Sequence, residues 1–130
     1  MNLFEWDCPL KPISVNHAIK HGRRGSYKTS DLIVFVRMFN TCLSQHGKKI
    51  IPDKPLKITV DFMIPKEVFY TKKNTVAKKN DLDNWLKYTI DGLANFLGFN
   101  DSLVCEIITR KVPSDTWRIK GSIQEASFIS

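Results

Sequence analysis

The most informative residues are acidic and lie where lysines are also dense. Four of the nine aspartates fall between residues 81 and 101, in the fragment NDLDNWLKYTIDGLANFLGFND. Mg²⁺ prefers oxygen ligands and is usually held by one or two carboxylates together with substrate phosphate oxygens. Such an ion can orient a hydroxide for attack on a phosphodiester and stabilise the leaving oxygen. The cluster therefore predicts a magnesium site, with one or two ions, that acts on a phosphate ester.

The spacing of the first two aspartates constrains where a helix begins. Asp81 and Asp83 would point about 200° apart on a regular helix, so they converge only if Asp81 lies outside it. As an N-cap, Asp81 would border one pocket with Asp83 at the positive end of the helix dipole. Lys87 follows Asp83 by one turn on the same face, where it can neutralise a carboxylate or reach a phosphate.

Asp101 lies beyond the other end of this predicted helix. A helix of about 16 residues spans about 24 Å, so Asp101 leaves from the far end. It can rejoin Asp81 and Asp83 if the next strand runs back, or a neighbouring subunit can supply its own Asp101. A purely structural interpretation also fits these residues, with Asp81 as a cap, Asp83 facing the dipole and Asp101 starting a turn.

The elements that must position these residues follow from periodicity. We predict a single α+β domain over residues 1–130, with a mostly antiparallel or mixed sheet packed against two main helices. The expected strands are 3–8, 56–64, 103–112 and 116–124, the last two joined by a hairpin loop at 113–115. The expected helices start at an N-cap Ser30 and run to about 45, and from 82 to 97. Basic mobile loops are expected at 14–28, where a partly extended arm is the alternative, and at 66–80, with a tail at 125–130.

The basic charge points to a polyanionic partner. Lys and Arg number 20 against 13 Asp and Glu, a formal charge of +7. Such a balance is typical of nucleic-acid binding, although solubility alone also accounts for it. The candidate backbone contacts are Lys72, Lys73, Lys78 and Lys79, with Arg23 and Arg24 as a second strip. Phe69 or Tyr70, between basic residues, could wedge into strained bases, or could instead anchor the loop to the core.

Several other classes are disfavoured. The longest apolar run, residues 32–36, is far shorter than the roughly 20 residues that span a bilayer. The first ten residues carry Glu5 and Asp7 and no basic region, unlike a secretory signal, so we expect a cytoplasmic protein. Phosphate-loop and dinucleotide fingerprints are missing, so no small-molecule cofactor is expected. The three widely spaced cysteines are interpreted as small buried hydrophobes.

The motifs together resemble one known family. The string Asp81-Leu82-Asp83-Asn84-x-x-Lys87, followed by Asn100-Asp101-Ser102-x-Val104, resembles the RusA family of Holliday-junction resolvases. The opening segment from Pro12 to Asn16 also resembles that family's P-x-S-x-N start, so the similarity extends over about residues 6–112.

This resemblance implies a small, Mg²⁺-dependent, homodimeric endonuclease, often encoded by prophages, that cuts symmetrically related strands of four-way-junction DNA; Mn²⁺ is expected to substitute. It places the catalytic and metal-binding aspartates on Asp81, Asp83 and Asp101, and the catalytic lysine on Lys87. One departure is Asn100, where the family usually has an aspartate. Two alternatives remain: a catalytically silent branched-DNA-binding protein of phage replication, and a related nuclease for other branched DNA.

Overall fold

The computed structural model describes residues 2–14, 19–22, 25–70 and 82–128. Its strands are β1 (Phe4–Cys8), β2 (Ile19–Gly22), β3 (Gly25–Lys28), β4 (Leu56–Pro65), β5 (Val104–Ser114) and β6 (Arg118–Glu125). Its helices are α2 (Ser30–Gln45), the short α3 (Lys66–Phe69), α4 (Leu82–Leu97) and the 3₁₀ turn η1 (Asp101–Leu103). The protein is thus a small α+β domain, which confirms the predicted fold class.

Four of the strands form one mixed sheet in the order β1-β6-β4-β5. β6 pairs antiparallel with both β1 and β4, whereas β5 pairs parallel with β4. The predicted hairpin between the last two strands is therefore wrong, because β4 lies between β5 and β6. The connection, at residues 115–117, carries the chain across β4 rather than into a neighbouring antiparallel strand.

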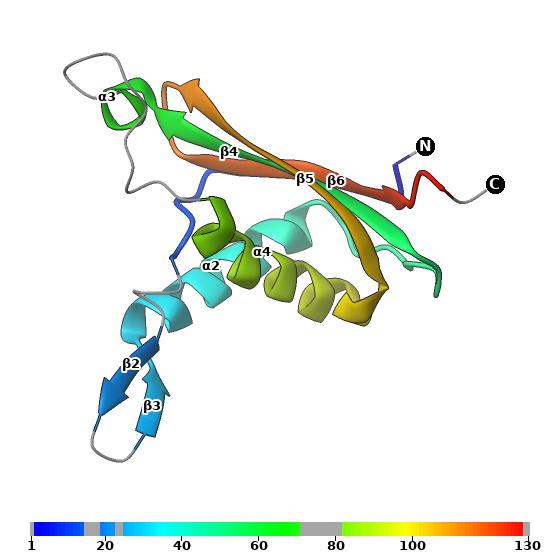
Figure 1. Cartoon of the computed structure of the whole chain (residues 1–130), viewed down its shortest axis with the longest axis horizontal. Coiled ribbons are helices and arrows are strands. Elements are labelled where there is room, and N and C mark those ends of the chain that lie inside the picture. Colours follow the sequence, from blue (N-terminus) through cyan, green and yellow to red (C-terminus); the bar gives the residue numbers. More distant parts are fainter. Residues whose placement is uncertain (1, 15–18, 23–24, 71–81, 129–130) are drawn as a thin grey trace.

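The helices α2 and α4 cover one face of this sheet (Figure 1). Alternation along β4 directs Leu56, Ile58, Val60, Phe62 and Ile64 into the core, each fully buried. The intervening residues of β4 are only partly buried, as the period of two in a strand requires. The sheet thereby provides a rigid base on which α4 and its acidic ends are held.

The packing of the two helices explains a glycine in the motif region. A Cβ on Gly92 of α4 would lie 2.7 Å from Cδ2 of Phe39, which α2 presents at 1% exposure. Real Cβ atoms do not approach so closely, so the Phe39 ring occupies the space that any larger residue would need. Gly98, with φ of 75°, then ends α4 in the left-handed conformation that favours glycine.

The start of α2 differs from the expectation. The N-cap is Thr29, not Ser30, and its hydroxyl accepts a hydrogen bond from the Leu32 N–H at 3.3 Å. Val36, which fits the helical apolar spacing, is 43% exposed. It shares this exposure with Ile33, Val34 and Met38, so α2 has a second apolar face that points away from the core.

The two predicted loops contain regular structure. Within 14–28, β2 and β3 pair as a two-stranded hairpin that projects from the body of the domain (Figure 1), which agrees with the extended-arm alternative. Within 66–80, residues 66–69 form α3 and the rest after Tyr70 lies outside the described residues. The predicted tail also begins later than expected, because Ala126 is buried and donates its N–H to the Pro55 carbonyl.

No helix among the described residues combines the length and apolar character needed to cross a membrane.

Candidate active site

Asp83 occupies the first turn of α4 and is exposed to solvent. Its Oδ1 accepts a hydrogen bond from the Asn84 N–H at 3.1 Å, so the carboxylate lies against the helix N-terminus. The unpaired backbone N–H groups there give that end of a helix a partial positive charge, which stabilises an anion. Asp81 lies outside the described residues, so its convergence with Asp83 stays a prediction.

Lys87 lies one turn further along α4 and is also exposed. Its Nζ is 3.9 Å from Oδ2 of Asp91 and 5.6 Å from the centroid of the Tyr88 ring. The carboxylate that Lys87 approaches is thus Asp91, not Asp83. An exposed pair at this distance contributes little stability, so the ammonium group can leave Asp91 for a phosphate at small cost.

Asp101 begins the η1 turn that follows α4, and its side chain is exposed. The preceding Asn100 is the N-cap of this turn, and its Oδ1 accepts the Ser102 N–H at 2.9 Å. An asparagine and an aspartate can both make this bond. The departure at Asn100 therefore preserves the local geometry that presents Asp101, and the amide oxygen is committed to the backbone.

Asp83 and Asp101 lie at opposite ends of α4, as the helix length predicts. The helix between them rises about 20 Å at 1.5 Å per residue. Asp101 instead adjoins the second half of α4, where a shallow hollow of about 490 Å³ is lined by Asp91, Asn95 and the residues from Gly98 to Asp101. One chain therefore does not bring the described members of the predicted acidic site together.

A groove between α2 and α4 brings Lys87 together with two cations that sequence analysis missed, Lys28 and Arg37. It has a volume of about 910 Å³, and its lining includes Lys28, Arg37 and Lys87 with the neutral amides Asn40 and Asn95. Arg37 is the one basic residue of α2 and stands between apolar neighbours in the sequence. A lone cation in an apolar stretch was the sequence feature that could have marked Arg37 as a candidate binding residue. Lys28 ends β3, so its place in the groove depends on how the hairpin joins α2.

The two candidate wedge aromatics have different environments. Phe69 is 8% exposed and belongs to the core, so it anchors α3 and is not available to stack on a base. Tyr70 is 43% exposed, and its ring packs edge-on against Phe69 with centroids 4.8 Å apart. The remaining predicted DNA contacts all lie outside the described residues: Arg23, Arg24, Lys72, Lys73, Lys78 and Lys79.

Comparison with known proteins agrees with the type of site that these residues define. The matching family model is that of an endodeoxyribonuclease, described as endodeoxyribonuclease RusA, and it covers residues 9–124. This match spans nearly all of the 130 residues, so the chain belongs to the RusA family. Membership implies a nuclease that resolves Holliday junctions. No curated protein matches the chain.

Proposed function

We propose that the protein is a Mg²⁺-dependent endonuclease that resolves four-way DNA junctions by paired, symmetric incisions. It would act as a homodimer in the cytoplasm of a bacterial or phage-infected cell. The proposed metal ligands are Asp81, Asp83 and Asp101, and Lys87 is the proposed catalytic lysine. The observation that carries the proposal is the family match together with the exposure of Asp83, Lys87 and Asp101, each at the motif position.

The donor set suits a hard cation. Asp83 and Asp101 offer carboxylate oxygens at the surface, which is the ligand type that Mg²⁺ prefers while it retains several waters. When bound, Mg²⁺ would supply an activated water for attack on the phosphodiester and would neutralise charge on the leaving oxygen. Mn²⁺ offers similar ligand preferences and would substitute.

The protein's own residues would hold and orient the DNA. Lys87 would exchange its long contact with Asp91 for a phosphate oxygen near the start of α4. Arg37 and Lys28 line the same groove as Lys87 and would extend the phosphate-binding path along α2. Tyr70, which is exposed beside the buried Phe69, would be the aromatic that stacks at the junction centre.

The separation of Asp83 from Asp101 supports a dimer in which each site combines two protomers. A two-fold dimer presents two identical sites related by the same operator, as two symmetric cuts in a four-way junction require. The exposed apolar side chains of Val34 and Met38 on α2, which do not line the groove that contains Arg37 and Lys87, offer a surface for such an association. Two chains also double the formal charge of +7 that attracts the DNA backbone.

The test is cleavage of synthetic four-way junctions with and without Mg²⁺. Wild type should give paired nicks at symmetric positions only with the metal, and Asp83→Asn should abolish them. Asp115→Asn is the matched control, because Asp115 is an exposed aspartate in the connection before β6 and should leave cleavage intact. Undiminished cutting by Asp83→Asn would refute the proposed site.

The same assay separates the alternatives. High-affinity binding to four-way junctions, without cleavage in the presence of any divalent metal, would favour a catalytically silent branched-DNA-binding protein. Faster cutting of forks or flaps than of junctions would favour a related nuclease with another substrate. Asn100, the sequence feature that motivates a silent protein, has a capping role here that leaves Asp101 presented to solvent.

A further inference from the structure

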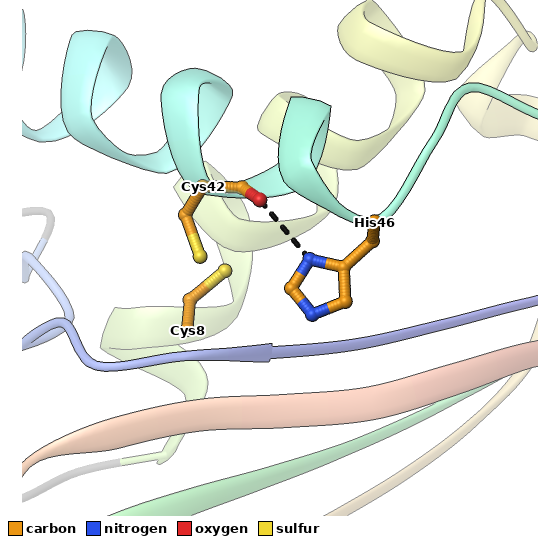
Figure 2. Close-up of side chains that lie close together, drawn as sticks. All are labelled: Cys8, Cys42 and His46. Carbon is orange, nitrogen blue, oxygen red and sulfur yellow. Dashed lines mark hydrogen bonds between the residues drawn. The ribbon is translucent and has the colours of Figure 1, made fainter.

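Two thiols and an imidazole, one from the first strand and two from the end of α2, meet between β1 and α2. Cys8 ends β1, Cys42 lies in the last turn of α2, and His46 is the C-cap of that helix. One candidate ligand atom from each residue lies within 4.8 Å of the others. Figure 2 shows the two sulfurs facing each other across the gap, with the ring beside them.

The hydrogen bonds of His46 define its tautomer. Nδ1 lies 3.0 Å from the Cys42 carbonyl oxygen, which can only accept, so the ring proton is on Nδ1. Nε2 therefore carries the lone pair, and it accepts the backbone N–H of Asp7 at 3.1 Å. A histidine that binds a metal usually donates its other N–H to a carbonyl in this way, which fixes the ring and raises its basicity.

The surroundings leave these groups without another evident function. The Asp7 carboxylate is already paired with Arg118, whose Nε is 2.7 Å from Oδ1, so this carboxylate does not compete for the cluster. The Asp7 carbonyl oxygen accepts a hydrogen bond from the Cys42 thiol at 3.9 Å, which the thiol would give up on binding a metal. Cys8 is completely buried, and its sulfur faces that of Cys42. The expectation that all three cysteines are buried hydrophobes holds for Cys8 but not for Cys105, which is exposed.

We propose that Cys8, Cys42 and His46 bind one Zn²⁺ ion. Two thiolates and an imidazole are the donors that Zn²⁺ prefers, whereas Mg²⁺ takes oxygen ligands. Water completes the coordination from the side of His46, which retains solvent access. Binding converts two thiols to thiolates with release of their protons, and Nε2 exchanges the Asp7 N–H for the ion.

The consequence of this site is a clamp between the first strand and the helix that follows the hairpin. β1 is an edge strand, paired only with β6 among the described strands, so a metal link to α2 fastens its end. The site shares no residue with the proposed junction-cleaving site, so either can fail without the other.

The experiment is a Zn²⁺ titration of the full chain, reduced and stripped of metal, against a chromophoric chelator. Removing a hydrogen-bond partner of a metal ligand lowers metal affinity about 10–100-fold. Removing a ligand itself, in Cys42→Ser or His46→Gln, should therefore lower Zn²⁺ affinity at least about 100-fold. Cys105→Ser is the matched control and should bind one equivalent like wild type. Cys8 is left intact because its complete burial makes its replacement a risk to folding.

Two further measurements test whether the cysteine sulfurs bind the metal and whether the metal stabilises the link between β1 and α2. Co²⁺ in the same site should show sulfur-to-metal charge transfer in wild type and Cys105→Ser, weakened in Cys42→Ser. Zn²⁺ should raise the Tm of wild type and of Cys105→Ser, but not the Tm of Cys42→Ser. Equal Zn²⁺ affinity in wild type and Cys42→Ser, no thiolate band with Co²⁺, or a Cys8–Cys42 disulfide that resists treatment with a thiol reductant would overturn the proposal.

Discussion

Asp83 and Asp101 are held at opposite ends of α4, so the helix that connects them also keeps them apart. The helix rises about 20 Å from its first turn to its last, and side-chain rotation does not shorten this backbone span. If both carboxylates serve one reaction, their meeting depends on a second copy of the chain.

Mixing inactive variants tests this arrangement. In a two-fold dimer with shared sites, Asp83→Asn paired with Asp101→Asn leaves one site with both native carboxylates and one site with neither. We expect each variant alone to be inactive and the mixed dimer to nick one strand of a junction, measured with strand-specific end labels. A mixed dimer as inactive as its parents would place all the carboxylates within one protomer.

The reciprocal mixture is the control. A chain carrying both substitutions, paired with wild type, damages both shared sites and should give no cleavage. The same mixture would retain one intact site if each protomer worked alone. The two mixtures therefore give opposite results under the two arrangements.

Removing the charge of Asp83 should strengthen junction binding when no metal is present. A bare carboxylate repels the DNA backbone, and exposed charges of this kind contribute at most about 1 kcal/mol. We expect Asp83→Asn to bind about 2- to 5-fold tighter than wild type in EDTA, with the difference shrinking as salt screens the charges. Asp115→Asn should not change affinity, and weaker binding by Asp83→Asn in a gel-shift or anisotropy assay would contradict the repulsion.

Gly92→Ala should destabilise the protein although alanine is the better helix former. The gain in helix propensity is about 1 kcal/mol, whereas overpacking against the buried Phe39 ring costs about 1–3 kcal/mol. Urea denaturation should therefore show a net loss. Adding Phe39→Leu should recover part of it, and Asn95→Ala, an exposed position of α4, should change the free energy of unfolding by less than about 0.5 kcal/mol.

Asp61 and Arg110 predict a dependence of stability on acid pH. The Arg110 guanidinium donates to both carboxylate oxygens, at 2.9 and 2.6 Å, and lowers the pKa of Asp61. Because the folded pKa lies below the unfolded value of about 3.9, the stabilisation is complete above that pH and is lost as pH falls through the folded pKa. Asp61→Asn should cost about 1 kcal/mol at pH 7, and this cost should shrink as the pH falls through the folded pKa.

The control for this pH dependence is Glu125→Gln. Glu125 pairs with Lys54 at 3.4 Å, but both side chains are well exposed, so its replacement should leave the unfolding free energy nearly unchanged at pH 7 and at pH 2. An Asp61→Asn cost that stays constant between pH 7 and pH 2 would show that the ion pair is not its source.

The sequence predicted the elements better than their pairing. The period of two in β4 and the apolar stripe of α4 each report one buried face, so both were located almost to the residue. The order of strands depends on which faces of distant segments meet, and a short polar connection at 113–115 fits a hairpin as well as a crossing. Val36 fits the helical spacing of α2 but is exposed, because spacing does not say how wide the covered face is.

The candidate site was predictable as a set of residues but not as an assembly. The motif positions of Asp83, Lys87 and Asp101 follow from residue type and spacing, and all three are exposed. The contacts of these side chains could not be predicted from residue type and spacing. Lys87 lies close to Asp91, and the Asn100 side chain accepts a hydrogen bond from a backbone N–H. The cluster of Cys8, Cys42 and His46 could not be predicted from sequence spacing, because only tertiary packing brings the end of a strand next to the end of a distant helix.

The position of β6 has a consequence for how the chain acquires its structure during synthesis. β6 lies between β1 and β4, and pairs Phe4 with Ile123 from nearly opposite ends of the sequence. Until its residues have left the ribosome, β1 has no strand to join and one edge of β4 stays open. Pairings between such distant segments form slowly. The four-stranded sheet of the nascent chain would therefore stay incomplete until β6 has been synthesised.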